Sequence, residues 1–161
     1  MSKILAGVIS DTHLNGIEEK LIRLYDNYLA HCDYIIHAGD LVADEVISFF
    51  KKPVFAVRGN MDFNSKLPVK RTVEILNKKI GIIHGYGAPE GIEDRIAKEF
   101  KDVNCIVYGH THNPKSELIN GVLFFNPGSP FDRRWSDRCS LGYLEIDEKG
   151  IKGIIKEVKE D

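Results

Sequence analysis

The chain is short of cysteine, of net charge and of long hydrophobic runs, and each shortage excludes a class of protein. Its three cysteines, Cys32, Cys105 and Cys139, are scattered and form no Cys-x-x-Cys pair, which argues against a disulfide framework and for a reducing interior. The apolar stretch at the N-terminus stops at Asp11, so it is too short for a signal sequence or a membrane span. We therefore expect a cytoplasmic protein with no membrane partner.

The charge balance and the length narrow the class further. A net charge of −2 gives no general attraction to nucleic acid or to anionic membranes. A specific nucleotide-like substrate stays compatible with it, because a metal site would supply local positive charge that the net count omits. A chain of 161 residues buries a core without covalent staples, and we expect a single domain over residues 1–161.

Short apolar runs alternate with amphipathic segments over the first third of the chain. Near-continuous apolar runs predict parallel strands buried on both faces, at residues 4–10, 34–39 and 54–59. Apolar residues at helical spacing predict helices between them, at residues 17–30 and 43–50. This alternation is typical of an α/β fold.

The rest of the chain has the pattern of hairpins, with one further helix and one further buried strand. Candidate turn residues separate paired strand-like segments, with turns at Asn77–Lys78, at Asn120–Gly121 and at residues 147–150. A helix is expected over residues 92–100 and a buried strand over 105–109. The sum predicts a layered α/β domain with a parallel half and an antiparallel half.

Polar side chains follow five of the predicted strands, at the point where each strand ends. They are carboxylate, amide and imidazole groups: Asp11, His13, Asp40, Asn60, His84, His110 and His112. Because the carboxyl ends of the strands form the rim where ligands bind in open α/β sheets, these side chains are expected to converge.

Each of these residues taken alone has an ordinary explanation, as a helix cap, a turn residue, a hydrogen-bonded core histidine or a solvated loop histidine. A single metal site accounts for all of them at once and places them at one edge. His31, near a helix end, and His37, inside a strand, do not follow this pattern, and we expect both to be structural.

The types of ligand restrict the metal. Oxygen and imidazole ligands without thiolate disfavour a structural zinc knot and suit manganese, nickel, iron or catalytic zinc. Seven ligands are too many for one ion but suit two ions that share a carboxylate. Two neighbouring metals form the recurring site for phosphoryl displacement.

Five short motifs occur in order, namely DTH (11–13), GD (39–40), GN (59–60), HG (84–85) and GHTH (109–112). This set resembles the calcineurin-like metallophosphoesterases, and within them the short single-domain phosphodiesterases of bacteria and archaea. The resemblance runs from residue 4 to about residue 130 and includes NPGS (126–129). It implies a four-layer αββα sandwich, with two mixed sheets packed face to face and helices outside.

The resemblance also implies roles for the polar side chains. It assigns them to two divalent ions, Mn²⁺ first with Ni²⁺, Fe²⁺ or Zn²⁺ as alternatives: Asp11, His13 and His112 to one, Asn60, His84 and His110 to the other, and Asp40 to both. A hydroxide bridging the two ions would attack phosphorus in line. Asp40 and Asn60 would be catalytic, and the Asn60 amide would also donate to a phosphate oxygen. The expected substrate is a small phosphodiester or nucleotide-like ester, and a homodimer is expected.

The motif GN is followed by a departure from the family pattern. Larger relatives have a histidine at the next position, able to protonate the leaving oxygen, whereas this chain has Met61, whose thioether cannot donate a proton. We therefore expect a preference for esters with an acidic leaving alcohol. Asp62 could act through water, although a structural hydrogen bond is the favoured interpretation.

An arginine pair follows NPGS. Relatives have an arginine in this vicinity, so Arg133 is expected to contact the substrate phosphate. The spacing does not decide between Arg133 and Arg134, and a solvated charged loop is an equal alternative.

Two other functions are weighed against hydrolysis. Gly85, Gly87 and Gly91 could form the phosphate loop of a dinucleotide enzyme, but their spacing differs by one from the common fingerprint, and the other motifs stay unexplained. A non-catalytic scaffold is the stronger alternative, because retromer contains a subunit of this fold with part of its ligand set missing. Here every ligand position is filled, which favours an enzyme.

Overall fold

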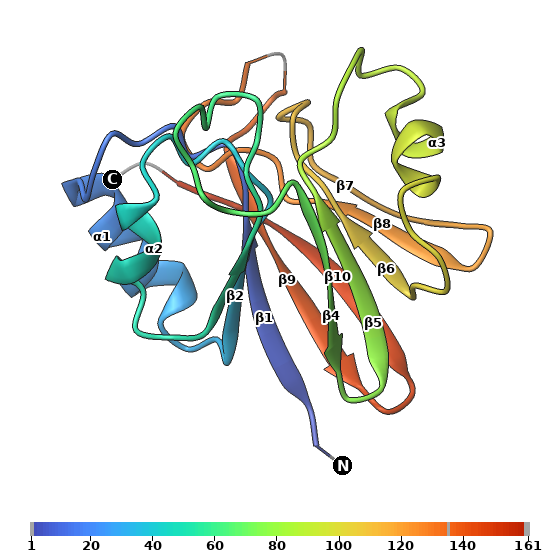
Figure 1. Ribbon diagram of the computed structural model, residues 1–161. Coiled ribbons are helices and arrows are strands. Elements are labelled where there is room, and N and C mark those ends of the chain that lie inside the picture. Colours follow the sequence, from blue (N-terminus) through green and yellow to red (C-terminus); the bar gives the residue numbers. More distant parts are fainter. Residues whose placement is uncertain (1, 135, 160–161) are drawn as a thin grey trace.

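A computed structural model describes residues 2–134 and 136–159, and its centre is a pair of five-stranded sheets packed face to face (Figure 1). The first sheet has the order β10-β9-β1-β2-β3. Its strands are β1 (Ile4–Ile9), β2 (Tyr34–His37), β3 (Val54–Ala56), β9 (Ser140–Asp147) and β10 (Gly150–Glu157). The second sheet has the order β4-β5-β6-β8-β7. Its strands are β4 (Lys70–Ile75), β5 (Lys78–Ile83), β6 (Cys105–Val107), β7 (Lys115–Ile119) and β8 (Val122–Asn126).

Helices cover the outer faces of the two sheets (Figure 1). On the first sheet lie α1 (Glu19–Leu24), its π-helical continuation η1 (Tyr25–Leu29) and α2 (Glu45–Phe49); α3 (Ile92–Ala97) lies on the second sheet. The four-layer αββα sandwich is therefore confirmed. Among the described residues, no helix has the length and hydrophobicity to cross a membrane.

Each interface between layers has its own apolar cluster. Between the sheets lie residues such as Val8, Ile36 and Val107, all fully buried. Separate clusters fill the space under α1 and α2, around Leu21, and under α3, around Ile96. Burial of this kind is the main favourable contribution to the stability of the sandwich.

The ring of Phe125 joins the two sheets. It is fully buried on β8 and lies against two glycines of the opposite sheet, Gly142 on β9 and Gly153 on β10. A β-carbon at Gly142 would come within 2.3 Å of the ring, and one at Gly153 within 2.6 Å. Only glycine leaves room for the ring at this distance between the sheets.

The sheets differ from the expected division into a parallel and an antiparallel half. The parallel pairing of β1, β2 and β3 is as expected, but β9 adds to β1 antiparallel, with Ile4 opposite Ile146. In the second sheet β5, β6 and β8 are parallel, and hairpin partners flank them. Both sheets are mixed, because strands distant in sequence pair where the local pattern indicates only hairpins.

The predicted hairpin turns are present, with one shift. Asn120 and Gly121 both have positive φ, at 50° and 82°, as a tight hairpin turn requires. The other turn is formed by Leu76 and Asn77, with φ of 49° and 66°, and not by Asn77 and Lys78, because Lys78 already pairs with Ile75. The predicted helices are present but shorter at their ends.

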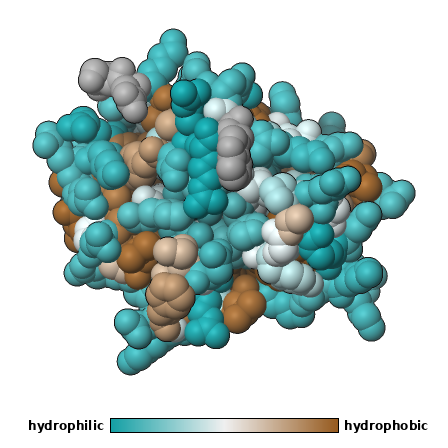
Figure 2. All heavy atoms as spheres, turned by 90° about the horizontal axis from the view of Figure 1, so that it is seen from above, coloured by the Kyte–Doolittle hydropathy of each residue, from teal (hydrophilic) through white to brown (hydrophobic). Residues whose placement is uncertain are grey.

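The parallel strands all end at the same side of the sandwich, at the top in Figure 1. Seen from that side, the loops present a mostly hydrophilic surface with hydrophobic side chains toward its edges (Figure 2). The motifs that follow these strands therefore share one surface.

Candidate metal centre

Five of the seven predicted ligands come together at this surface, from both sheets. The first sheet provides Asp11 and His13 from the loop after β1, and Asp40 from the loop after β2. The second provides His84, directly after β5, and His112 from the loop after β6. The convergence follows from the parallel strands, whose carboxyl ends meet at one edge.

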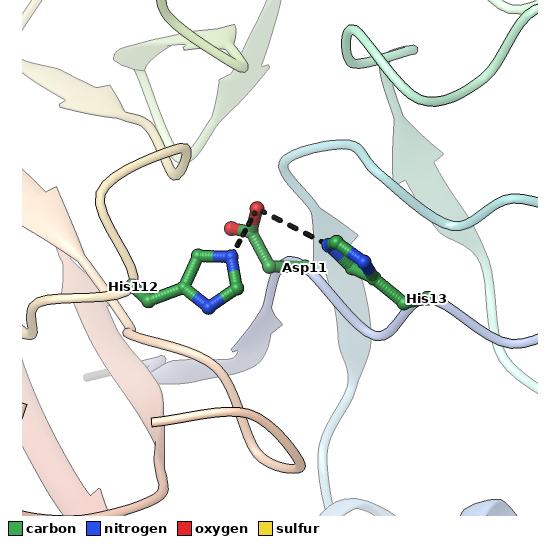
Figure 3. Close-up of side chains that lie close together, drawn as sticks. All are labelled: Asp11, His13 and His112. Atoms are coloured by element: carbon green, nitrogen blue, oxygen red, sulfur yellow. Dashed lines mark ion pairs between the residues drawn. The ribbon is translucent and has the colours of Figure 1, made fainter. Parts of the chain in front are cut away.

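The five side chains form two overlapping groups that could each hold a cation. Asp11, His13 and His112 make the first group (Figure 3), and Asp11, Asp40 and His84 make the second. Within each group the ligand atoms lie within 4.8 Å of one another. Both groups therefore contain the carboxylate of Asp11.

The shortest approaches are between imidazoles and carboxylates. Nε2 of His112 lies 3.2 Å from Oδ1 of Asp11, and Nε2 of His84 lies 3.3 Å from Oδ2 of Asp40. Nε2 of His13 lies between the carboxylates, 3.5 Å from Oδ2 of Asp40 and 3.8 Å from Oδ1 of Asp11. A cation among these atoms would have ligands on several sides.

Four of these atoms are buried and make no hydrogen bond within the described part of the chain: Asp11 Oδ1, His13 Nε2, His84 Nε2 and His112 Nε2. Leaving a buried polar atom unsatisfied costs about 1–3 kcal/mol. Since the four atoms belong to the two groups of candidate ligands, cations held there would satisfy all of them.

Hydrogen bonds on the far side of two rings fix which nitrogen faces the centre. Nδ1 of His84 donates to the carbonyl of Ala38 over 2.8 Å, and Nδ1 of His112 donates to the carbonyl of Asp132 over 2.7 Å. A carbonyl only accepts, so Nδ1 carries a proton and the lone pair of the neutral ring is on Nε2. This arrangement is typical of metal-binding histidines.

The carboxylates and imidazoles shift one another's pKa. Burial alone would raise the pKa of Asp11, but the interactions with His112 and His13 outweigh it and hold the pKa well below its usual range. The pKa of Asp40 is also held low, because His13 and His84 outweigh its burial. Asp11 and Asp40 raise the pKa of His13 from 6.5 to about 9. A proton on His13 therefore balances the carboxylates until a cation displaces it.

The loops that carry the candidate ligands have strained backbones. Five predicted ligands have φ between 51° and 73°, in the left-handed region: Asp11, His13, Asp40, His110 and His112. This conformation costs a residue with a β-carbon about 1–3 kcal/mol, and such residues cluster at functional sites. The strain is what we expect where side-chain placement matters more than local stability.

Glycines of the motifs allow the loops to approach closely. A β-carbon at Gly109 would lie 2.0 Å from Oγ of Ser10 and 2.6 Å from Oδ2 of Asp11. One at Gly59 would lie 2.2 Å from Oδ1 of Asp40. These glycines therefore leave the space that the two carboxylates occupy.

The two other predicted ligands, Asn60 and His110, lie close to His84. Asn60 is exposed and lines a cleft together with His84. His110 packs edge-on against the ring of His84, with centroids 5.4 Å apart, while its Nε2 donates to the carbonyl of Gly87. Metal binding by Asn60 and His110 stays a prediction.

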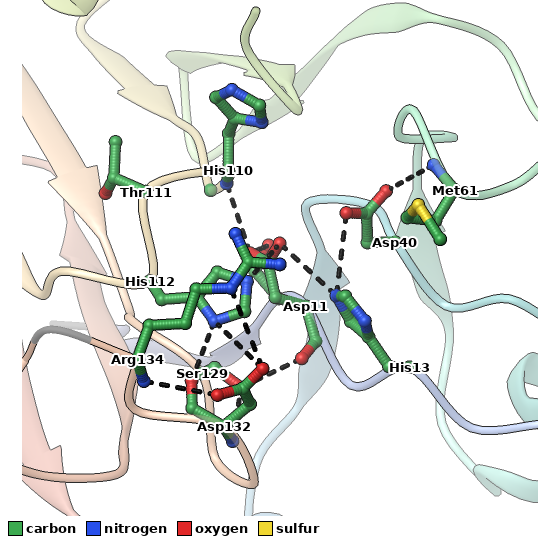
Figure 4. A network of polar contacts seen from close by, with 12 residues as sticks. Asp11, His13, Asp40, Met61, His110, Thr111, His112, Ser129, Asp132 and Arg134 are labelled. Atoms are coloured by element: carbon green, nitrogen blue, oxygen red, sulfur yellow. Dashed lines mark hydrogen bonds and ion pairs between the residues drawn. The ribbon is translucent and has the colours of Figure 1, made fainter. Parts of the chain in front are cut away.

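Asp62 fixes the loop of Asp40, a role that the sequence only partly indicated. Its buried carboxylate accepts hydrogen bonds from the backbone N–H groups of Asp40 (2.8 Å), Leu41 (3.3 Å), Val42 (2.5 Å) and Gly59 (2.8 Å). These bonds support the structural interpretation of Asp62 over a role in proton transfer. Asp40 also accepts a bond from the backbone of Met61, over 2.8 Å (Figure 4).

We expect Asp62→Asn to weaken metal affinity by about 10–100-fold, the usual cost of removing a group that orients a ligand. The amide nitrogen would face backbone N–H donors and disturb the Asp40 loop, so competition with a fluorescent chelator should detect the loss. Asp102→Asn, at an exposed position, is the matched control. Unchanged metal affinity in Asp62→Asn would show that the Asp40 loop holds its place without this carboxylate.

His37 is a structural residue, as expected, and it connects two of the motifs. The backbone N–H of Gly39 donates to its Nδ1 over 3.1 Å, so Nε2 carries the proton and donates to Oγ1 of Thr12 over 3.0 Å. Complete burial lowers the pKa of His37 to about 3, so the ring is neutral. The sign of this contact in the sequence is that His37, a polar residue, stands within an otherwise apolar buried strand.

Of the arginine pair, Arg134 is the one connected to the centre. Arg133 is exposed. Nε of Arg134 lies 3.7 Å from Oδ2 of Asp132, whose carbonyl accepts the bond from His112 (Figure 4). Contact of either arginine with the substrate phosphate stays a prediction. The neighbouring Trp135 lies outside the described residues.

Comparison with known proteins gives a family match over most of the chain. The profile of the calcineurin-like phosphoesterase superfamily domain matches residues 4–149. A Methanocaldococcus jannaschii protein named "Probable metallophosphoesterase" is 38% identical over 132 residues, which are 79% of this chain and 68% of the relative. Another M. jannaschii protein, named a phosphodiesterase, is 31% identical over an alignment of 171 residues, covering 94% of this chain and 98% of its own.

The fold also matches solved structures. The zinc complex of Vps29 from Entamoeba histolytica aligns with a TM-score of 0.71 and 22% identity, over 97% of this chain and 100% of that one. Identity at this level shows a shared fold and nothing about activity.

Proposed function

Because the chain belongs to the calcineurin-like phosphoesterase superfamily, we propose that it is a metal-dependent phosphodiesterase that uses two divalent ions, Mn²⁺ first. The observation that carries the proposal is a set of four buried atoms without a hydrogen bond: Nε2 of His13, His84 and His112 all lie within 3.8 Å of Oδ1 of Asp11. The phosphodiesterase named among the relatives supports the choice of a diester.

The donor set fits such ions, since carboxylate oxygen and imidazole nitrogen suit manganese, nickel, iron and catalytic zinc. Asp11, His13 and His112 would hold one ion, Asn60, His84 and His110 the other, and Asp40 both. When bound, the ions supply positive charge for the phosphate oxygens and lower the pKa of water to make a nucleophile. The chain itself keeps the ligand rings oriented, through the Nδ1 bonds of His84 and His112.

No described side chain next to Asn60 is suited to protonate a leaving alkoxide. Met61 has no proton to donate, and the carboxylate of Asp62 is occupied by backbone N–H groups. The rate should therefore depend steeply on the pKa of the leaving alcohol. Hydrolysis of a series of aryl phosphodiesters, with the corresponding monoesters beside them, measures this dependence.

Met61→His is the informative variant, because Met61 is 40% exposed and tolerates replacement. General acid catalysis contributes about 10²–10⁴-fold, so the variant should hydrolyse poor leaving groups faster and reduce the slope. A flat dependence in the unaltered protein would contradict the proposed lack of a proton donor. Tight metal binding without hydrolysis of any ester would contradict the enzyme and favour the scaffold.

A cytoplasmic location and a homodimer belong to the proposal as well, and size-exclusion chromatography with light scattering would test the dimer.

A further inference from the structure

A cleft of about 240 Å³ adjoins the candidate metal centre. It lies between the loop after β3 and the loop after β5, and its walls include Arg58, Asn60, Val69, His84, Tyr86 and Glu99. Because His84 belongs both to the cleft and to the second group of candidate ligands, a phosphoester held at the metals would have one of its organic groups at the cleft.

Exposed hydrophobic side chains gather on the same two loops. Among the described residues, seven large hydrophobic side chains are exposed, and four of them are here: Met61 (40%), Phe63 (80%), Val69 (54%) and Tyr86 (47%). Figure 2 views the molecule from this side and shows hydrophobic groups breaking the polar surface toward the edge. Two of them, Val69 and Tyr86, line the cleft, so its walls offer exposed apolar surface to a ligand.

Tyr86 is held in position by Glu99, another residue of the cleft wall. Its hydroxyl donates to Oε2 of Glu99 over 3.2 Å, and Oε1 of Glu99 pairs with Nζ of Lys70 at 3.0 Å. A ring that is fixed at its hydroxyl and exposed on its face loses little freedom when another ring stacks on it.

Arg58 gives the cleft a positive charge. Its side chain is exposed, and the hydrogen bond from its Nη1 to the carbonyl of Ser65 is long, at 3.5 Å. The guanidinium can therefore turn to an acidic group of a ligand, or stack on a flat ring.

We propose that this cleft binds an aromatic ring of the substrate's organic group, a nucleobase being the biological ring of suitable size, with Tyr86 as the stacking residue. The inference rests on the proposed function for the reacting phosphate. Pockets that enclose drug-sized ligands measure about 300–1,000 Å³, so this smaller cleft suits one ring system. Val69, Ile83 and Tyr86 offer apolar contact, which suits a base better than a sugar.

The test compares ligands that differ only in the base. Calorimetry on the Mn²⁺-loaded protein should give adenosine 5′-monophosphate an affinity about tenfold above that of ribose 5-phosphate, since stacking on one aromatic ring is worth roughly that factor. Tyr86→Leu should abolish the difference and leave ribose 5-phosphate binding unchanged. Tyr86→Phe should keep most of it, because the ring remains. Leu118→Ala, which alters a 69% exposed side chain on β7, is the control.

Adenosine separates failure of the cleft from failure of the proposed function, because it has no phosphate. Its binding, followed by the NMR shifts of the Tyr86 ring, needs the cleft alone and should persist in Asp11→Asn. Equal affinity for the two phosphates, or an unchanged preference in Tyr86→Leu, overturns the proposal. A change from dimer to monomer in Tyr86→Leu, with the preference for the base intact, also overturns the proposal, because the surface around Tyr86 would then serve self-association. Loss of all phosphate binding and hydrolysis, with adenosine still bound, contradicts the proposed function instead.

Discussion

Asp11→Asn should lower kcat/KM for an aryl phosphodiester by about 10³-fold or more, because metal-ion catalysis contributes several kcal/mol and each 1.36 kcal/mol is tenfold in rate. Asp11 is the residue that both groups of candidate ligands share. An amide in its place removes one negative charge from both groups at once. Metal content after dialysis, measured by atomic emission, should fall in parallel with activity.

Two variants serve for comparison with Asp11→Asn. Asp40→Asn affects the second group directly, and the family resemblance gives Asp40 the bridging position, so the relative metal losses show which carboxylate bridges. Asp44→Asn is the matched control, because the Asp44 carboxylate bonds Ser65 and Lys66 outside the centre. Full metal content and activity in Asp11→Asn would remove Asp11 from the site.

Metal affinity should rise by about 100-fold between pH 6 and pH 8, from the displaced proton of His13 alone. The neighbouring carboxylates raise the pKa of His13 to about 9, so below that pH a divalent ion must displace a proton. The pKa of His84 is also raised, which increases the slope: burial opposes the rise, but Asp40 and Asp11 outweigh it. Calorimetry in buffers of different protonation enthalpy counts the protons released.

The stability of the metal-free protein should show the opposite trend. Since the pKa of His13 is higher in the folded protein, protonated His13 stabilises the fold fully below about pH 6.5 and loses that effect as pH rises through about 9. His37 acts in the other direction, because its lowered pKa makes stability fall as pH drops from 6.5 toward 3. The Tm of chelated protein should therefore peak near pH 6.5.

A metal affinity independent of pH, with no proton release on binding, would contradict the protonated state of His13.

The strands could be predicted from the sequence, but their pairing could not. Apolar runs such as residues 4–10 mark buried strands wherever they occur, because burial on both faces needs no polar alternation. The pairing of β1 with β9 joins residues at opposite ends of the chain, and no local pattern encodes it. The shift of one hairpin turn to Leu76–Asn77 has a similar cause, since the register of the strands decides it.

The candidate centre was predictable to the level of backbone position. The rule that strand ends meet at one edge brought Asp11, Asp40 and His84 together correctly. It could not give the orientation of a side chain, such as that of His110, whose Nε2 donates to the carbonyl of Gly87. The hydrogen bonds of Asp62 to its neighbours depend on the three-dimensional course of a loop, which its position after GN does not show.

Because the candidate ligands come from both sheets, a bound ion would act as a cross-link. It would tie the segment around Asp11 to the segment around His112, closing a long stretch of chain as a disulfide does in secreted proteins. No disulfide joins the described residues, so this part of the chain has no covalent tie of this kind. Removing the metal should weaken the contact between the two sheets at this edge. A protease would then cut first in the loops that carry the candidate ligands.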